Sequence, residues 1–147
     1  MARRSFFSFD YNHVWKVNQI RNMPTVIGTA AAGFHDASIW EEAKKKGDKT
    51  IKAMIDKALN NTSVTVVCIS YGTSVRKYIN YEIDQSIARG NGLVGVQIHH
   101  LKDQDGNTHS VGGAPSQIAA NGFKTYKYSN ADALARWIEE AAKIAGK

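Results

Sequence analysis

The chain has 147 residues, of which 43% are hydrophobic and 22% are charged, and its formal net charge is +6. This length suits one domain that buries most of its apolar surface, and the composition is that of a globular protein rather than a disordered one. No stretch is both long enough and free enough of charge to predict a membrane helix. We therefore expect a single domain over residues 1–147.

The amino-terminal segment and the charge pattern narrow the class of protein. Arg3 and Arg4 lead into a short apolar run at 5–9, which lacks both the length of a signal-peptide core and a cleavage site, so we expect a cytoplasmic protein. The positive charge favours nucleic acid, an anionic lipid surface or a phosphate-bearing small molecule. No aromatic residues interleave with the basic ones, which ranks nucleic acid last. The lysine run at 44–46 is expected on a solvated helix face or loop.

The first half of the chain alternates short apolar runs with helical periodicity. Strands are expected at 5–9 and 25–27, with a helix at 13–22 between them. Residues 28–40 are rich in alanine and glycine and are expected to form an irregular loop. A helix over 49–59 carries apolar residues at i, i+3 and i+4.

The second half begins with the run Val64–Ile69, which is apolar on both faces and is expected at the centre of a parallel sheet. A helix at 76–88 follows, with isoleucines every fourth residue facing the sheet. Further strands are expected at 93–98 and 123–128, joined by a long polar segment at 99–122. Asn130 or Asp132 then caps a last helix.

These elements predict a flavodoxin-like α/β fold, with a doubly wound five-stranded parallel sheet in the order 2-1-3-4-5. The switch point of that order falls between the first and third strands. A ligand should therefore lie against Phe9-Asp10 and the turn at 70–73. Segments 28–40 and 99–122 are expected to border this crevice and to become ordered on binding, because loops of that length rarely serve connection alone.

One pair of side chains near the switch point is a candidate for chemistry. Tyr78 and Glu82 are four residues apart on one helix face, so both are expected to look into the crevice, with Glu82 in contact with solvent. The alternative is that both decorate the rim of an amphipathic helix. Cys68, the single cysteine, lies within an apolar run and is expected to be a buried hydrophobe rather than a catalytic thiol.

Other site classes are disfavoured. Strand 64–69 ends in serine and tyrosine where a phospho-receiver needs an aspartate. His99 and His100 are adjacent at a strand end and have no third ligand at a recognised spacing, so neither a metal site nor a bound cofactor is expected.

Five segments, taken together, resemble the TIR-like proteins of bacterial Thoeris anti-phage systems. They are RSFFSFDY at 4–11, VNQIRN at 17–22, FHDASIW at 34–40, CISYGT at 68–73 and RKYINYEI at 76–83. The five segments follow one another in this order and together span most of the chain. The resemblance implies one TIR-like domain over residues 1–147.

This resemblance also implies an activity. Such enzymes carry a catalytic glutamate on the helix after the third strand, four residues beyond an aromatic that is often tryptophan, and Glu82 and Tyr78 match these positions. Their substrate is NAD, and their product is nicotinamide with ADP-ribose or a cyclic or conjugated ADP-ribose signal. Tyrosine in place of tryptophan still permits stacking and leaves the product open.

Further residues are candidates for substrate binding. Phe9 and Tyr78 are expected to stack on the nicotinamide or adenine ring, although Phe9 is equally well a core residue at a strand end. Arg76 and the amides around Gly72 and Thr73 suit the pyrophosphate. Second-rank candidates for polar contacts are Asp10, Asn18, Asp36 and Ser38, where Asp36 is equally well a structural cap.

Two hypotheses about function follow. In the first, the protein is an NAD-consuming enzyme of phage defence that self-associates and passes a nucleotide signal, with a cyclic form favoured, to a downstream effector. In the second, it is a catalytically silent TIR-like module that acts by homotypic association or nucleotide binding.

Overall fold

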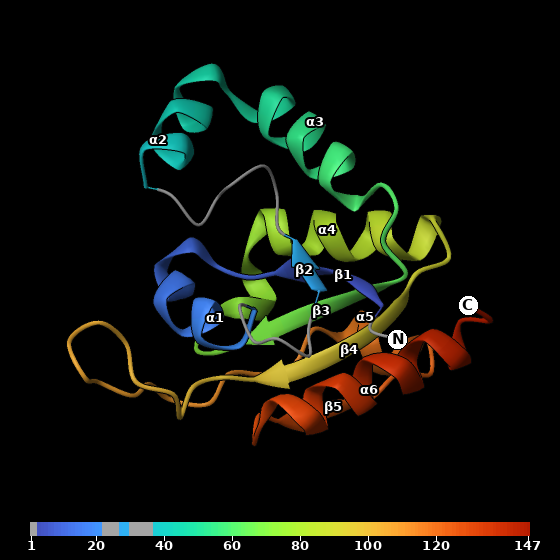
Figure 1. Cartoon of the computed structure of the whole chain (residues 1–147). Coiled ribbons are helices and arrows are strands. Elements are labelled where there is room, and N and C mark those ends of the chain that lie inside the picture. The colour runs from blue at the N-terminus through green and yellow to red at the C-terminus, as the bar shows by residue number, and fades with distance from the viewer. Residues whose placement is uncertain (1–2, 22–26, 30–36) are drawn as a thin grey trace.

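A parallel sheet runs through the middle of the molecule with helices on both faces, as the computed structural model of residues 3–21, 27–29 and 37–147 shows (Figure 1). The strand order is β2-β1-β3-β4-β5, and every neighbouring pair is parallel. The expected α/β class with a helix-flanked parallel sheet is confirmed. The strands are β1 (Arg4–Ser8), β2 (Ile27–Thr29), β3 (Val64–Ile69), β4 (Gly92–Gln97) and β5 (Thr125–Lys127).

The helices form the two outer layers. Helices α1 and α6 pack on one face of the sheet, while α3, α4 and α5 lie on the other, next to α2. None of the helices in the described part of the chain is long and apolar enough to cross a membrane. Their bounds are η1 (Tyr11–His13), α1 (Val14–Arg21), α2 (Ala37–Lys46), α3 (Asp48–Leu59), η3 (Thr73–Val75), α4 (Lys77–Ala88), α5 (Ser116–Ala120) and α6 (Ala131–Ile144).

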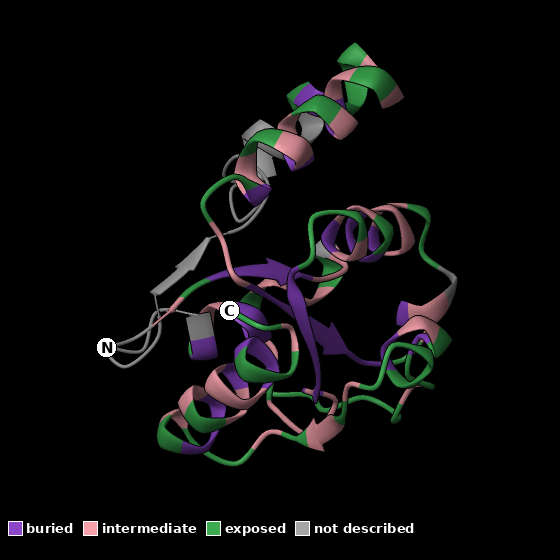
Figure 2. Ribbon diagram, turned by 90° about the vertical axis from the view of Figure 1, so that its right-hand side faces the viewer, coloured by how far each residue is buried: buried purple, intermediate pink, exposed green. Residues whose placement is uncertain are grey.

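Strand β3 is buried along its whole length, which confirms its expected central position (Figure 2). Val66 and Cys68 face α1 and α6, whereas Val67 and Ile69 face α4 and α5, as the period of two along a strand requires. Cys68 is only 1% exposed and belongs to this core, in agreement with its interpretation as a buried hydrophobe.

Helix α6 completes the core on the β4 side. Its N-cap is Asn130, whose side chain accepts a hydrogen bond from the Ala133 amide at 2.8 Å. The Trp137 ring stacks on Tyr126 of β5 with centroids 4.5 Å apart. At the other end of the helix, Gly92 of β4 lies so close to the backbone that an added Cβ would be 2.4 Å from the Ala141 carbonyl oxygen.

Several expected boundaries are wrong. The loop expected at 28–40 includes part of β2 and the first turn of α2, and residues 30–36 lie outside the described residues. Strand β2 is Ile27–Thr29 rather than 25–27, of which 25 and 26 are not described. The segment 99–122 contains α5, so β4 and β5 are joined through a helix. A five-residue helix with a single buried residue, Ile118, is too short to show periodicity in sequence.

The contact of Gly92 with α6 predicts that Gly92→Ala lowers the free energy of unfolding by about 1–3 kcal/mol, the usual cost of overpacking a close contact. Urea denaturation measures this change. Gly113→Ala is the matched control, because an added Cβ at that exposed position meets no atom within 4 Å. Equal stability of both variants would contradict the close approach of β4 and α6.

Candidate active site

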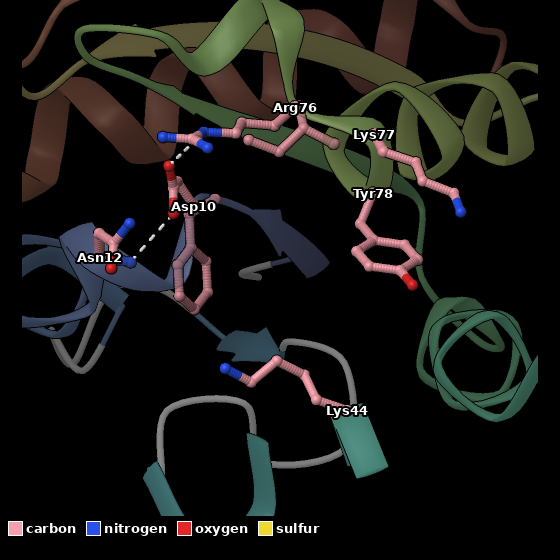
Figure 3. Close-up of a pocket in the computed structure, with 8 residues that line it drawn as sticks. Asp10, Asn12, Lys44, Arg76, Lys77 and Tyr78 are labelled. Atoms are coloured by element: carbon pink, nitrogen blue, oxygen red, sulfur yellow. Dashed lines mark hydrogen bonds and ion pairs between the residues drawn. The ribbon is translucent and has the colours of Figure 1, made fainter. Parts of the chain in front are cut away.

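A pocket of about 320 Å³ opens where β1 ends and α4 begins, at the carboxyl edge of the sheet (Figure 3). Its volume lies at the lower end of the range for small-molecule sites. Four of its residues were expected from the sequence: Phe9, Asp10, Arg76 and Tyr78. The others are Asn12, Lys44, Lys77 and Ile79. The lining carries three cations and one carboxylate, and two of the cations, Arg76 and Lys77, are paired with Asp10 and with Asp48 of α3.

Asp10 and Arg76 form an ion pair at the mouth of the pocket. The Arg76 Nε lies 2.7 Å from Asp10 Oδ2, and the backbone N–H of Asn12 donates to Asp10 Oδ1 at 3.0 Å. The Asp10 side chain is 9% exposed, whereas that of Arg76 is 52% exposed. The buried Asp10 carboxylate therefore holds the more exposed Arg76 guanidinium at the pocket. In this conformation the Asp10 carboxylate is itself occupied by Arg76.

Tyr78 is held from α3 by Asp48, a residue that the sequence analysis missed. The Tyr78 hydroxyl donates to Asp48 Oδ1 at 2.9 Å, and the Lys77 ammonium lies 2.7 Å from the same oxygen. Hydrogen bonds from Lys77 and Tyr78 lower the pKa of Asp48 to about 2. The Tyr78 ring packs against the apolar cluster around Phe6 and Ile55. Its hydroxyl and ring are thus both anchored, with the ring at the pocket wall.

Glu82 does not line this pocket and is buried between α4 and the sheet. Its residue exposure is 5%, and the Ser8 hydroxyl donates to Glu82 Oε1 at 2.8 Å. The expectation that Glu82 is open to solvent is therefore wrong for this conformation. Four residues beyond Tyr78, Glu82 lies about one helical turn further along α4, which takes it away from the helix start where the pocket opens.

Burial controls the charge of this carboxyl group. Loss of hydration raises the pKa of Glu82 to about 8, while the hydrogen bond from Ser8 opposes part of that rise. At neutral pH the group is therefore mostly a neutral carboxylic acid. Glu82 loses its proton near neutral pH only when its burial is reduced or a positive charge comes close to it.

Residues 6–103 match the family described as "Thoeris protein ThsB, TIR-like domain". A relative from Bacillus cereus (strain MSX-D12), described as "Putative cyclic ADP-D-ribose synthase ThsB1", is 44% identical over 133 residues. The alignment covers 88% of this chain and 67% of that relative. The chain belongs to the Thoeris ThsB TIR-like family. The matched residues include the pocket and Glu82.

In this member of the ThsB family the turn after β3 does not line the pocket. Gly72 has a left-handed backbone with φ of 78°, and Thr73 is fully buried. The Thr73 amide donates to the Ser70 carbonyl at 3.2 Å, and its hydroxyl accepts from the Ser70 amide at 2.9 Å. The Thr73 amide, which was expected to contact a pyrophosphate, is thus engaged within the turn itself.

The remaining candidates lie elsewhere or outside the described part of this ThsB-family domain. Asn18 is a half-buried residue of α1 and does not line the pocket. Ser38 lies in α2, but its side chain is outside what the structure describes, and Asp36 is outside the described residues altogether. These three residues stay predictions.

The first part of segment 99–122 packs against α1, whereas α5 packs beside α4 through Ile118, and no described residue of the segment lines the pocket. Lys16, whose side chain is fully buried, donates to the His99 carbonyl at 3.1 Å and lies 2.6 Å from His109 Nδ1. Asp103 faces the other nitrogen of His109 at 3.7 Å. Burial lowers the pKa of Lys16. In the sequence, the contact of Lys16 with His99 and His109 is indicated by nothing more than a lysine that stands between the apolar residues Trp15 and Val17.

The raised pKa of Glu82 predicts how stability depends on pH. The folded protein binds a proton at Glu82 up to about pH 8, whereas an unfolded chain releases it near 4.5. Proton binding at Glu82 therefore stabilises the folded protein fully below pH 4.5, and this stabilisation is lost as the pH rises toward 8. Glu82→Gln cannot bind this proton. The free energy of unfolding of the wild type should therefore fall, relative to that of Glu82→Gln, by about 1.4 kcal/mol per pH unit across that window.

Chemical denaturation at several pH values between 5 and 8 measures this difference. Asp84→Asn is the control, because Asp84 is an exposed carboxylate on the same helix. A constant difference between Glu82→Gln and the wild type would show that Glu82 titrates normally in the folded state.

Proposed function

We propose that this protein cleaves NAD at the bond between nicotinamide and ribose and converts the remainder into an ADP-ribose-derived signal, with a cyclic form favoured, in anti-phage defence. The observation that carries the proposal is a carboxyl group buried one helical turn beyond an aromatic and cationic pocket on the same helix. The description of the Bacillus cereus relative as a cyclic ADP-D-ribose synthase supports the same chemistry.

The strand order supports a ligand site at this edge. In the order 2-1-3-4-5 the connections from β1 and β3 leave the sheet toward opposite faces, which opens a crevice at their carboxyl ends. In the proposed complex, Phe9 and Tyr78 contact a ring of the dinucleotide. Arg76 and Lys77 interact with its pyrophosphate, whose negative charges the cations of the pocket complement.

The proposed chemistry needs one carboxylate. As the bond between ribose C1′ and the pyridinium nitrogen breaks, its electron pair passes to nicotinamide, which leaves as a neutral molecule without protonation. The ribose then carries oxocarbenium-like positive charge, as in glycoside cleavage. Glu82 would stabilise that charge, and its low-dielectric surroundings would strengthen the interaction. A nucleophile next bonds to C1′ and loses its proton.

Access to Glu82 is part of the proposal. Ile79 lines the pocket and precedes Glu82 by three residues on α4, so its side chain borders the site of the carboxyl group. A shift of the Ile79 side chain would connect the pocket with Glu82. No separate cofactor is required, because NAD is the substrate. We further propose that the protein self-associates and reaches a downstream effector through the nucleotide.

One observation favours a second candidate function. Glu82 is buried and mostly neutral at pH 7, so in this conformation it offers little charge for catalysis. A TIR-like module that binds a nucleotide or a second copy of itself needs no such charge. Turnover measurements separate the two functions.

Glu82→Gln is expected to lower the rate of NAD cleavage about a hundredfold or more, because it removes the charge that stabilises the oxocarbenium-like centre. Mass spectrometry of nicotinamide and nucleotide products, with and without lysate of phage-infected cells as trigger, measures the rate and identifies the product. Equal rates in Glu82→Gln and the triggered wild type would refute the catalytic assignment. No turnover by the wild type under any trigger would favour the silent module.

Arg76→Ala is expected to raise KM for NAD about tenfold, the scale of one lost charge-assisted hydrogen bond, with a smaller effect on kcat. Steady-state kinetics at fixed ionic strength measures both constants. Arg136→Ala removes an exposed arginine from α6, away from the pocket, and serves as the control. An unchanged KM in Arg76→Ala would exclude Arg76 from substrate binding.

A further inference from the structure

A serine from the first strand contacts the proposed catalytic carboxyl group. Ser8 is the last residue of β1, is fully buried, and donates its hydroxyl proton to Glu82 Oε1 at 2.8 Å. The two residues are 74 positions apart in the chain, so the contact exists only because α4 packs on β1. Phe6, two residues earlier on the same strand face, packs in the apolar cluster of α3.

The surroundings of Glu82 make this hydrogen bond its main polar contact. Across the described residues, burial and the Ser8 hydroxyl are the causes of its displaced pKa, and no charged group from β1, β3, α3 or α4 contributes. A second buried hydrogen bond joins the sheet to α4, between the hydroxyl groups of Thr65 and Ser86, whose oxygens are 2.6 Å apart. Ser86 donates to the backbone carbonyl of Glu82 and not to its carboxyl group.

We propose that Ser8 is a positioning residue for Glu82: the Ser8 hydroxyl orients the Glu82 carboxyl group and favours its charged form at the reacting centre. The proposal rests on the proposed NAD cleavage for its catalytic meaning, while the contact itself is independent of any activity. A donor that points at a carboxyl oxygen stabilises the carboxylate more than the acid. Without it, a buried glutamate keeps its proton to higher pH.

The Ser8 hydroxyl opposes the effect of burial on the pKa of Glu82. Burial alone pushes the pKa of Glu82 upward and Ser8 pulls it back to about 8, so Ser8→Ala must raise the pKa further. A hydrogen bond to a charged group is of a size that corresponds to about one pH unit. Ser8→Cys keeps a similar shape with a weaker donor and should titrate between the wild type and Ser8→Ala.

The first test measures the carboxyl group without any substrate. Protein labelled with ¹³C at glutamate side-chain carboxyls is titrated by NMR, with the Glu82 resonance assigned by its disappearance in Glu82→Gln. We expect the midpoint to rise by about one pH unit in Ser8→Ala and by less in Ser8→Cys. Ser5→Ala is the matched control: Ser5 is also fully buried in β1, and its hydroxyl donates to the Arg3 carbonyl at 3.5 Å and not to Glu82.

The second test measures NAD cleavage as a function of pH. At pH 7 the rate of Ser8→Ala should fall about tenfold and recover above pH 9, since each pH unit below the pKa reduces the carboxylate fraction about tenfold. A merely destabilised variant would lose activity at every pH. Ser5→Ala should follow the wild-type profile.

The outcomes separate the two proposals. An unchanged Glu82 titration in Ser8→Ala overturns the role of Ser8, whatever the activity. A raised midpoint together with a shifted pH profile supports it. A raised midpoint with NAD cleavage that is insensitive to Glu82→Gln overturns the proposed function and the catalytic meaning of Ser8, while the hydrogen bond stands.

Discussion

The central strand β3 has no side that faces water, and the arrangement of the rest of the molecule depends on this constraint. Both of its faces must be covered, by α1 and α6 on one side and by α4 and α5 on the other. Polar groups that serve a ligand are therefore confined to the edge where the strands end. The pocket at the end of β1 and the start of α4 lies at that edge.

Glu82 is an exception to this separation of polar and apolar regions. It belongs to the layer that covers β1 and β3, beside Ile79 and Ile83, and is satisfied by one hydroxyl. A carboxyl group in such a position weakens the fold once it ionises, because its charge loses hydration. Sites that stabilise developing charge tolerate this cost, since the same low-dielectric surroundings strengthen each interaction with a reacting substrate.

The sequence was most informative where a pattern was long. The run at Val64–Ile69 and the isoleucines of α4 showed their period clearly, and both elements lie where expected. The switch-point rule also placed Phe9 and Asp10 at the pocket, whereas the turn at 70–73, which the same rule named, does not line it. Periodicity gives the direction of a side chain around a helix axis but not its depth beneath a neighbouring strand, which is why the burial of Glu82 was not foreseen. Asp48 was missed because its contact with Tyr78 joins residues 30 positions apart.

The two ends of the described chain meet at the opposite edge of the sheet from the pocket. Arg3, just before β1, binds the Glu139 carboxylate of α6 through two nitrogens at 2.9 and 3.1 Å and donates to the Lys147 carbonyl at 3.1 Å. An affinity tag, fluorescent reporter or second copy fused at either end would therefore extend from the amino-terminal edge of the strands. Such a fusion starts at a distance from the pocket, which opens where β1 ends and α4 begins.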